Sequence, residues 1–234
     1  MIYDIADQRI DIRNKFDFTT KFCRAYLSDD QSSHSDVTVE LTKAEFDEEK
    51  EKSEGYSDGY IENIAIYRKL CHQLVPLNRF LFHGVVLEYK GVAYLFTGRS
   101  GKGKSTHASL WTNYVEGASV LNGDKPIVAV EGDKLIAYGT PWNGKEGLGT
   151  KGKAEIKAIC FIEQAKRNYV ERMTPSECSE LIFRQLLIPK ETDGVIKTFE
   201  FAEKLLQLPV YRLFCDISEE AVRVAYRALI GGEL

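Results

Sequence analysis

The 234-residue sequence lacks long apolar runs, and its opening residues lack the pattern of a secretory leader. The first residues, MIYDIADQRIDIR, carry too many charges for the apolar core of a signal peptide. No stretch approaches the roughly 18 apolar residues that a membrane-spanning helix needs. We therefore expect a cytoplasmic protein with no membrane partner.

Cysteine is scarce, and positive charge is not in excess. The cysteines are odd in number, form no C-x-x-C motif and are scattered over positions Cys23, Cys71, Cys160, Cys178 and Cys215, which favours reduced thiols. There are 31 Lys and Arg against 35 Asp and Glu, with no basic tract, so a nucleic-acid partner is not favoured. With 44% hydrophobic residues, the chain can bury one good core, as one domain with an appendage.

Residues 1–79 differ in pattern from the rest and are predicted to form a small N-terminal α/β lobe. Two segments alternate like half-buried strands and two have helical spacing, in the order IYDIADQRIDIR, TTKFCRAYL, DVTVELT and IENIAIYRKLCHQLV. The charged stretch KAEFDEEKEKSEGYSDGY is interpreted as solvated surface. Acceptor recognition, structural cover and homo-oligomer formation all stay open as roles for this lobe.

Residues 80–234 mix strand hairpins with helices, which predicts an α/β protein with a mixed sheet. Lys90-Gly91 is expected to be a two-residue hairpin turn between the strands FLFHGVVLEY and VAYLFTG. PIVAV and LIAYG predict a second hairpin. A capping box, Thr174 with Glu177, begins the helix TPSECSELIFRQLL. The remaining strands are EIKAICFIEQ, NYVERM and VYRLFCD, and the remaining helices DGVIKTFEFAEKLLQL and SEEAVRVAYRAL.

The segment GRSGKGKST, residues 98–106, matches the phosphate-loop pattern G-x-x-x-x-G-K-[ST] between a predicted strand and a predicted helix over 105–115. Its glycines let backbone N–H groups converge on phosphate oxygens, and the helix N-terminus adds positive potential. Lys104 is expected to reach the β- and γ-phosphates of ATP, and the Ser105 hydroxyl to coordinate Mg²⁺. The residues expected at the nucleotide are Gly98, Arg99, Ser100, Gly101, Lys102, Gly103, Lys104, Ser105 and Thr106. A flexible Gly/Lys loop is the alternative.

Two further side chains are expected beside this loop. Asp124 ends the strand SVLNGD, and a helix of about eleven residues, about 16 Å long, lets the chain return to the loop. If Lys90-Gly91 is the turn, the two residue numbers in each cross-strand pair add up to about 181. This register places His83 opposite Gly98. The alternatives are a turn aspartate and a hydrogen-bonded structural histidine. His107 is expected to be structural, and His34 and His72 indicate no site.

The loop GTPWNGKEGLGTKGK, residues 139–153, holds five glycines and the lysines Lys145, Lys151 and Lys153. Such a loop can approach a polyanion and close over it. The alternative is a mobile surface connection. Trp142 is expected either to stack on a ligand or to pack.

The segments FHGVVLEYKGVAYLFTGRSGKGKSTHASLW and ASVLNGDKPIV resemble the HPr serine kinase/phosphorylase family and the wider phosphoenolpyruvate-carboxykinase-like superfamily. In that family a His-Gly-Val strand leads through a hairpin into the P-loop, and a strand ending in aspartate follows the P-loop helix. The resemblance covers roughly residues 80–130 and implies a P-loop kinase core over residues 80–234.

The resemblance also implies roles for individual residues. Asp124 acts as base towards the acceptor hydroxyl, His83 assists it, and Lys104 and Ser105 serve the phosphates and Mg²⁺. The family usually has Asp-Asp where this chain has Gly123-Asp124, so the metal and base roles are merged or reassigned. WNGKEGLG lies where the family has an arginine-containing substrate motif.

The leading hypothesis is an ATP- and Mg²⁺-dependent kinase that phosphorylates a hydroxyl of a protein, peptide or small molecule. Its expected catalytic residues are Asp124, His83 and Lys104, and its expected metal ligands are Ser105 and Asp124. A regulatory NTPase switch and a nucleotide-binding module without chemistry are the alternatives. The acceptor, the preferred base and phosphorolysis stay open.

Overall fold

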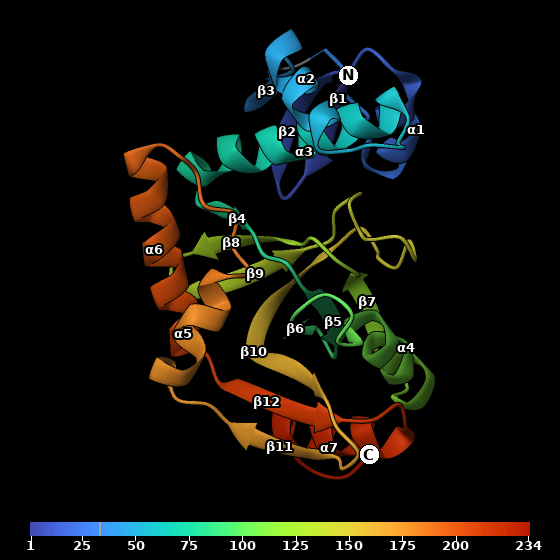
Figure 1. The fold of residues 1–234 in the computed structure, drawn as a ribbon, viewed down its shortest axis with the longest axis vertical. Coiled ribbons are helices and arrows are strands. Elements are labelled where there is room, and N and C mark those ends of the chain that lie inside the picture. The colour runs from blue at the N-terminus through green and yellow to red at the C-terminus, as the bar shows by residue number, and fades with distance from the viewer. Residues whose placement is uncertain (33) are drawn as a thin grey trace.

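The computed structural model describes residues 1–32 and 34–234. Two sheets of unequal size, one of three strands and one of nine, are stacked along the long axis of the molecule (Figure 1). Strands in the larger sheet run both parallel and antiparallel to their neighbours. The predicted α/β class with a mixed sheet is confirmed.

The N-terminal residues form the small sheet and the helices that cover it. β1 (Ile2–Ile5) pairs antiparallel with β2 (Gln8–Arg13), which pairs parallel with β3 (Val37–Glu40). The helices are α1 (Asp17–Phe22), the 3-10 turn η1 (Arg24–Tyr26), α2 (Lys43–Glu51), α3 (Asp58–Leu74) and the 3-10 turn η2 (Val75–Leu77).

Helix α2 lies in the stretch that the sequence pattern presents only as solvated surface. Its N-terminus is fixed by a capping box, in which the Thr42 side chain accepts from the Glu45 amide and the Glu45 carboxylate accepts from the Thr42 amide. Further along, the buried Glu49 carboxylate accepts hydrogen bonds from the Arg68 guanidinium of α3. The capping box and ion pairs such as Arg68–Glu49 and Lys69–Glu45, rather than an apolar stripe, define the helix.

The large sheet is organised around the long strand β10 (Lys153–Gln164). β6 (Val92–Thr97) runs parallel along one side, while β9 (Lys134–Tyr138) and β12 (Val210–Cys215) share the other side. The sheet continues through β5 (Val85–Tyr89) to β7 (Ser119–Asn122), and at the other end through β8 (Ile127–Glu131) to β4 (Arg79–Leu81), while β11 (Tyr169–Arg172) pairs with β12.

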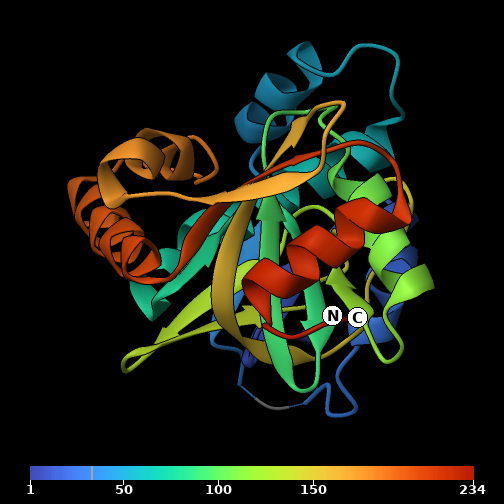
Figure 2. The ribbon, with the colours of Figure 1, turned by 90° about the horizontal axis from the view of Figure 1, so that it is seen from below.

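Helices cover both faces of this sheet. α4 (Lys104–Tyr114) and α7 (Glu219–Leu229) lie side by side on one face, as Figure 2 shows. α5 (Pro175–Phe183), with the capping box predicted for it, and α6 (Thr192–Gln207) pack on the other face. Successive residues of β6 face opposite sides of the sheet: Leu95 packs with α5 and α6, whereas Phe96 packs with α4.

The predicted hairpin and its register are confirmed. Val85 pairs with Phe96, and Lys90 and Gly91 form the turn with φ of 51° and 79°. The prediction of one continuous strand through FLFHGVVLEY is wrong, because β4 pairs with β8 and β5 pairs with β6. The chain changes neighbours at Gly84, where a Cβ would lie 2.8 Å from the Phe96 carbonyl oxygen.

The small sheet packs on the β8–β9 hairpin through one continuous apolar cluster. Helix α3 contributes Ile66 and Leu70 to this cluster, and the hairpin contributes Ile127 and Ile136. The division into domains at residue 79 stays a prediction, although the small sheet lies within residues 2–40 and the large one begins at Arg79. Among the described residues, no helix is both long and apolar enough to cross a membrane.

Candidate functional site

The glycine-rich loop joins the end of β6 to the start of α4, as the sequence motif requires. Gly98, Gly101 and Gly103 have φ of 142°, 80° and 91°, a region that other residues rarely adopt. A side chain at position 98 would also bring its Cβ to 3.0 Å from the Ile162 carbonyl oxygen. The glycines are therefore needed for the path that the backbone takes into the N-terminus of α4.

The Lys104 side chain folds back over this loop. Its Nζ donates to the Gly98 carbonyl at 3.0 Å. Burial lowers the pKa of Lys104, and the negative charge of Asp124 opposes this effect. The ammonium group thus lies within electrostatic reach of the second predicted site residue.

The other loop side chains differ in their surroundings. Arg99, Ser100 and Thr106 are exposed, and Ser105 is half-buried at the first turn of α4. The Lys102 ammonium forms an ion pair with Glu163 at 2.8 Å and so is directed to β10. The two lysines of the motif therefore have different roles in this structure, since Lys102 is bound to the sheet and Lys104 stays over the loop.

Asp124 lies in a tight turn after β7. The side-chain oxygen of the fully buried Asn122 accepts hydrogen bonds from the amides of Asp124 and Lys125, at 3.0 and 2.8 Å. The Asn122 amide group donates to the Thr140 hydroxyl at 2.9 Å. Asn122 was not predicted as a site residue, although Asn before Gly-Asp is a typical signal for a side chain that closes a turn on its own backbone.

The structure brings His83 and Asp124 together. The Nε2 of His83 lies 3.3 Å from Oδ1 of Asp124, and the Lys125 ammonium lies 3.0 Å from Oδ2. Burial would raise the pKa of the Asp124 carboxyl, but the His83 hydrogen bond and the Lys125 charge outweigh it and lower the pKa to about 2. Asp124 is therefore an ionised carboxylate at neutral pH.

The glycine-rich segment of residues 139–153 packs directly on the Asp124 turn. Gly144 has a φ of 90°, and a Cβ placed on it would lie 3.1 Å from the Asp124 Cβ. A Cβ at Gly123 would lie 2.5 Å from the Asn143 carbonyl oxygen. Trp142 packs rather than facing a ligand site: it is buried and stacks on Tyr67 of α3, with ring centroids 4.0 Å apart.

A hollow of about 580 Å³ adjoins the other side of the glycine loop. Its walls are Gly101 and Gly103 of the loop, Thr106 and Leu110 of α4, and the ends of β10 and β12. In the sheet, β10 and β12 lie on one side of β6, whereas β5 and β7 lie on the other. The hollow and Asp124 therefore flank the loop from opposite sides.

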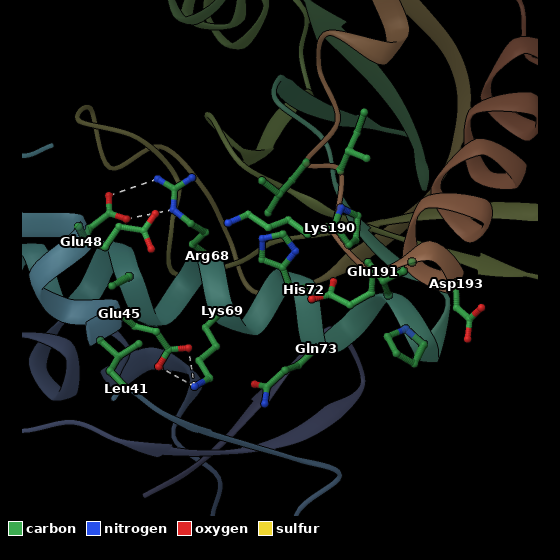
Figure 3. Close-up of a pocket in the computed structure, with 18 of the residues that line it drawn as sticks. Leu41, Glu45, Glu48, Arg68, Lys69, His72, Gln73, Lys190, Glu191 and Asp193 are labelled. Atoms are coloured by element: carbon green, nitrogen blue, oxygen red, sulfur yellow. Dashed lines mark hydrogen bonds and ion pairs between the residues drawn. The ribbon is translucent and has the colours of Figure 1, made fainter. Parts of the chain in front are cut away.

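A larger groove, of about 740 Å³, lies between α2, α3 and residues 187–194 (Figure 3). Arg68 and Lys69 of α3 belong to its lining and form ion pairs with Glu49 and Glu45 of α2. Within the described part of the chain, its lining includes neither the glycine loop nor Asp124. The groove is a separate feature of the molecule.

His107 has the structural role expected of it. It lies in α4 with its side chain buried, and its Nε2 accepts from the Trp111 indole at 2.9 Å. All five cysteines are free thiols and buried. In residues 1–32 and 34–234, no group of three or more His, Cys, Asp or Glu side chains could hold a metal ion by itself.

No protein-family model and no curated protein matches this chain. Among solved structures, the chain is similar to the HPr(Ser) kinase/phosphatase from Coxiella burnetii. The match has 14% identity and a TM-score of 0.35, and it covers 65% of this chain and 99% of that one. At this level the similarity assigns neither family nor activity, so the function has to be inferred from the site itself.

Proposed function

We propose that this protein is an ATP- and Mg²⁺-dependent kinase that transfers the γ-phosphoryl group to a hydroxyl, such as a serine of a protein or peptide or a small-molecule alcohol. The observation that carries this proposal is an ionised carboxylate, Asp124, held by His83 beside a glycine loop and its lysine. Phosphoryl transfer needs positioning and charge stabilisation above all, and these residues supply both.

The glycine loop would bind the phosphates. Its positive-φ glycines would let the backbone approach the phosphates at the start of α4, and Lys104 adds a positive charge over the loop. Lys104 exchanges its hydrogen bond with the Gly98 carbonyl for phosphate oxygens when the nucleotide binds. The charge that develops on the transferred group is then met by donors already in place.

The residues present fit a magnesium ion. Mg²⁺ in proteins usually has one or two carboxylate ligands, with substrate phosphates and water completing the octahedron. Asp124 offers a charged carboxylate, and the Ser105 hydroxyl offers a second oxygen at the start of α4. When bound, Mg²⁺ would neutralise part of the phosphate charge.

Asp124 would orient the acceptor hydroxyl and take up its proton as the new oxygen–phosphorus bond forms. The bond between the γ-phosphorus and its bridging oxygen breaks in the same transfer, and ADP leaves. His83 fixes one carboxylate oxygen of Asp124, and Lys125 pairs with the other. The Gly144 segment lies against the Asp124 side chain, which stays 27% exposed.

The hollow beside α4 fits the nucleoside end of ATP. It adjoins Thr106, and its walls include the apolar side chains Leu110, Ile162 and Ile217. Because it lies across the loop from Asp124, the triphosphate would run over the end of β6 towards the acceptor. In this direction the γ-phosphate, rather than the base, would lie beside the carboxylate.

The test is formation of ADP from ATP and Mg²⁺, with and without fractionated cytosolic extract, in the wild type, Lys104→Ala and Asp124→Asn. Stimulation by one fraction, with labelled phosphate on a hydroxyl and loss of both in the variants, supports the kinase. Asp124→Asn should still bind ATP. Steady hydrolysis that needs no acceptor would indicate a nucleotide-dependent switch, and ATP binding without turnover would indicate a binding module.

A further inference from the structure

Tyr67 of α3 connects the N-terminal helices to the Asp124 turn. Its hydroxyl donates to the backbone carbonyl of Lys125, the residue after Asp124, at 2.6 Å. The side chain is 4% exposed, and burial raises its pKa well above the ordinary value, so the hydroxyl remains a donor at physiological pH. This hydrogen bond joins residues that are remote in sequence.

The Tyr67 ring also fixes the segment that packs on the other side of the turn. It stacks on Trp142 at 4.0 Å with an interplanar angle of 15°. Trp142 is two residues before Gly144, the residue that touches the Asp124 side chain. One tyrosine therefore contacts both the backbone that carries Asp124 and the segment that restrains its side chain.

The other supports of the Asp124 turn come from residues 80–234, among them the Gly84 amide, which donates to the Asp124 carbonyl at 2.9 Å, and the His83 ring. The Asn122 side-chain oxygen accepts from the backbone amides of Asp124 and Lys125. The Thr140 hydroxyl donates to the Lys125 carbonyl that Tyr67 also bonds, over a longer distance of 3.2 Å. These groups come from the large sheet and the segment that follows β9. Tyr67 contributes a support from residues 1–79, whose role the sequence left open.

We propose that Tyr67 is a positioning residue for phosphoryl transfer, so that the N-terminal lobe forms part of the site through the turn that carries Asp124. The inference rests on the proposed kinase function for its activity readout and on the hydrogen bond and ring stack for its structural readout. Tyr67 acts through the Asp124 turn, since its hydroxyl bonds Lys125 and its ring stacks on Trp142.

The experiment compares Tyr67→Phe with Tyr138→Phe. Tyr138 is also buried and also links the two parts of the chain through its hydroxyl, which donates to Asp7 and Glu131 at 2.8 Å each. Within the described residues, that hydroxyl forms no hydrogen bond with the turn of residues 122–125, which makes Tyr138 a matched control. Both variants keep the ring and remove one hydroxyl, so folding should survive in each.

The first readout is amide hydrogen exchange in the peptide that covers residues 119–128, with nucleotide absent. Loss of one buried hydrogen bond should speed exchange there about fivefold in Tyr67→Phe and leave it unchanged in Tyr138→Phe. The second readout is kinetic: Tyr67→Phe should lower kcat about tenfold or more at an unchanged KM for ATP, because only the acceptor side of the site is displaced.

The outcomes separate the two proposals. Faster exchange at residues 119–128 with no transferase activity in the wild type would overturn the kinase and keep the support of the turn by Tyr67. Unchanged exchange in Tyr67→Phe, or equal effects on kcat in Tyr67→Phe and Tyr138→Phe, would overturn the positioning role. An altered KM for ATP with an unchanged kcat would overturn it as well.

Discussion

His83 Nε2 lies 3.3 Å from Asp124 Oδ1, at the point where the chain leaves β4 and enters β5. Backbone contacts hold this pair on both sides: the Thr97 hydroxyl donates to the His83 carbonyl at 2.8 Å, and the Gly84 amide donates to the Asp124 carbonyl at 2.9 Å. Because Thr97 immediately precedes the glycine loop, the histidine, the carboxylate and the loop share one rigid frame.

We expect His83→Ala to lower phosphoryl transfer about a hundredfold while ATP affinity is retained, because the carboxylate loses one of its two fixed partners. Steady-state kinetics with a saturating acceptor and an independent ATP-binding titration measure the two effects. His72→Ala is the control, since His72 is half-buried in the groove away from the site. Equal losses in both variants would refute the assisting role of His83.

Lys104→Ala should weaken ATP binding and reduce transfer by about a hundredfold or more, because a preplaced cation is removed from the phosphates. Lys157→Ala removes the same charge from an exposed ion pair with Glu155 and should leave both quantities unchanged. Isothermal titration with ATP and Mg²⁺ provides the comparison. ATP binding by Lys104→Ala at wild-type affinity would contradict the assignment of the loop as a phosphate site.

Sequence periodicity predicted the hairpin register because Lys90-Gly91 is a local signal for a turn with two positive φ angles. The length of the helix predicted over residues 105–115 also indicated that Asp124 lies near the glycine loop. The supports of that residue could not be predicted in the same way. Asn122 and Tyr67 act through contacts between distant segments, and an apolar helical stripe gives no sign of which tyrosine donates to a turn.

Contacts between distant segments also decide the packing of Trp142 and the break between strands at Gly84. A tryptophan in a glycine-rich segment fits equally well as a ligand platform or as a packing residue, and its neighbour Tyr67 decides between them. Strand propensity runs unbroken through His83, but the change of sheet neighbour depends on where β8 returns. Tertiary pairing, rather than local preference, set both outcomes.

Gly144→Ala and Gly147→Ala separate backbone strain from displacement of Asp124. Both glycines have positive φ, 90° and 64°, so each alanine should cost roughly 1–2 kcal/mol of unfolding free energy. Only at position 144 does the new Cβ meet Asp124, at 3.1 Å, whereas nothing lies within 4 Å at position 147. We expect transfer to fall about tenfold further in Gly144→Ala; equal activity in the two variants would argue against this contact.

His107, a buried residue of α4, should make the free energy of unfolding depend on pH. Burial lowers its pKa from 6.5 to about 4, so the unfolded chain binds a proton before the folded one does. The stability from the neutral imidazole is complete above pH 6.5 and is lost as the pH falls towards about 4. At pH 4.5 the loss amounts to roughly 2.5 kcal/mol relative to pH 7.

His107→Gln should remove this part of the pH dependence, because an amide oxygen can accept from the Trp111 indole without titrating. Urea unfolding at about pH 7 and pH 4.5 measures the difference for the wild type and the variant, and the groups common to both cancel. A variant that loses as much stability as the wild type would show that another group drives the acid sensitivity.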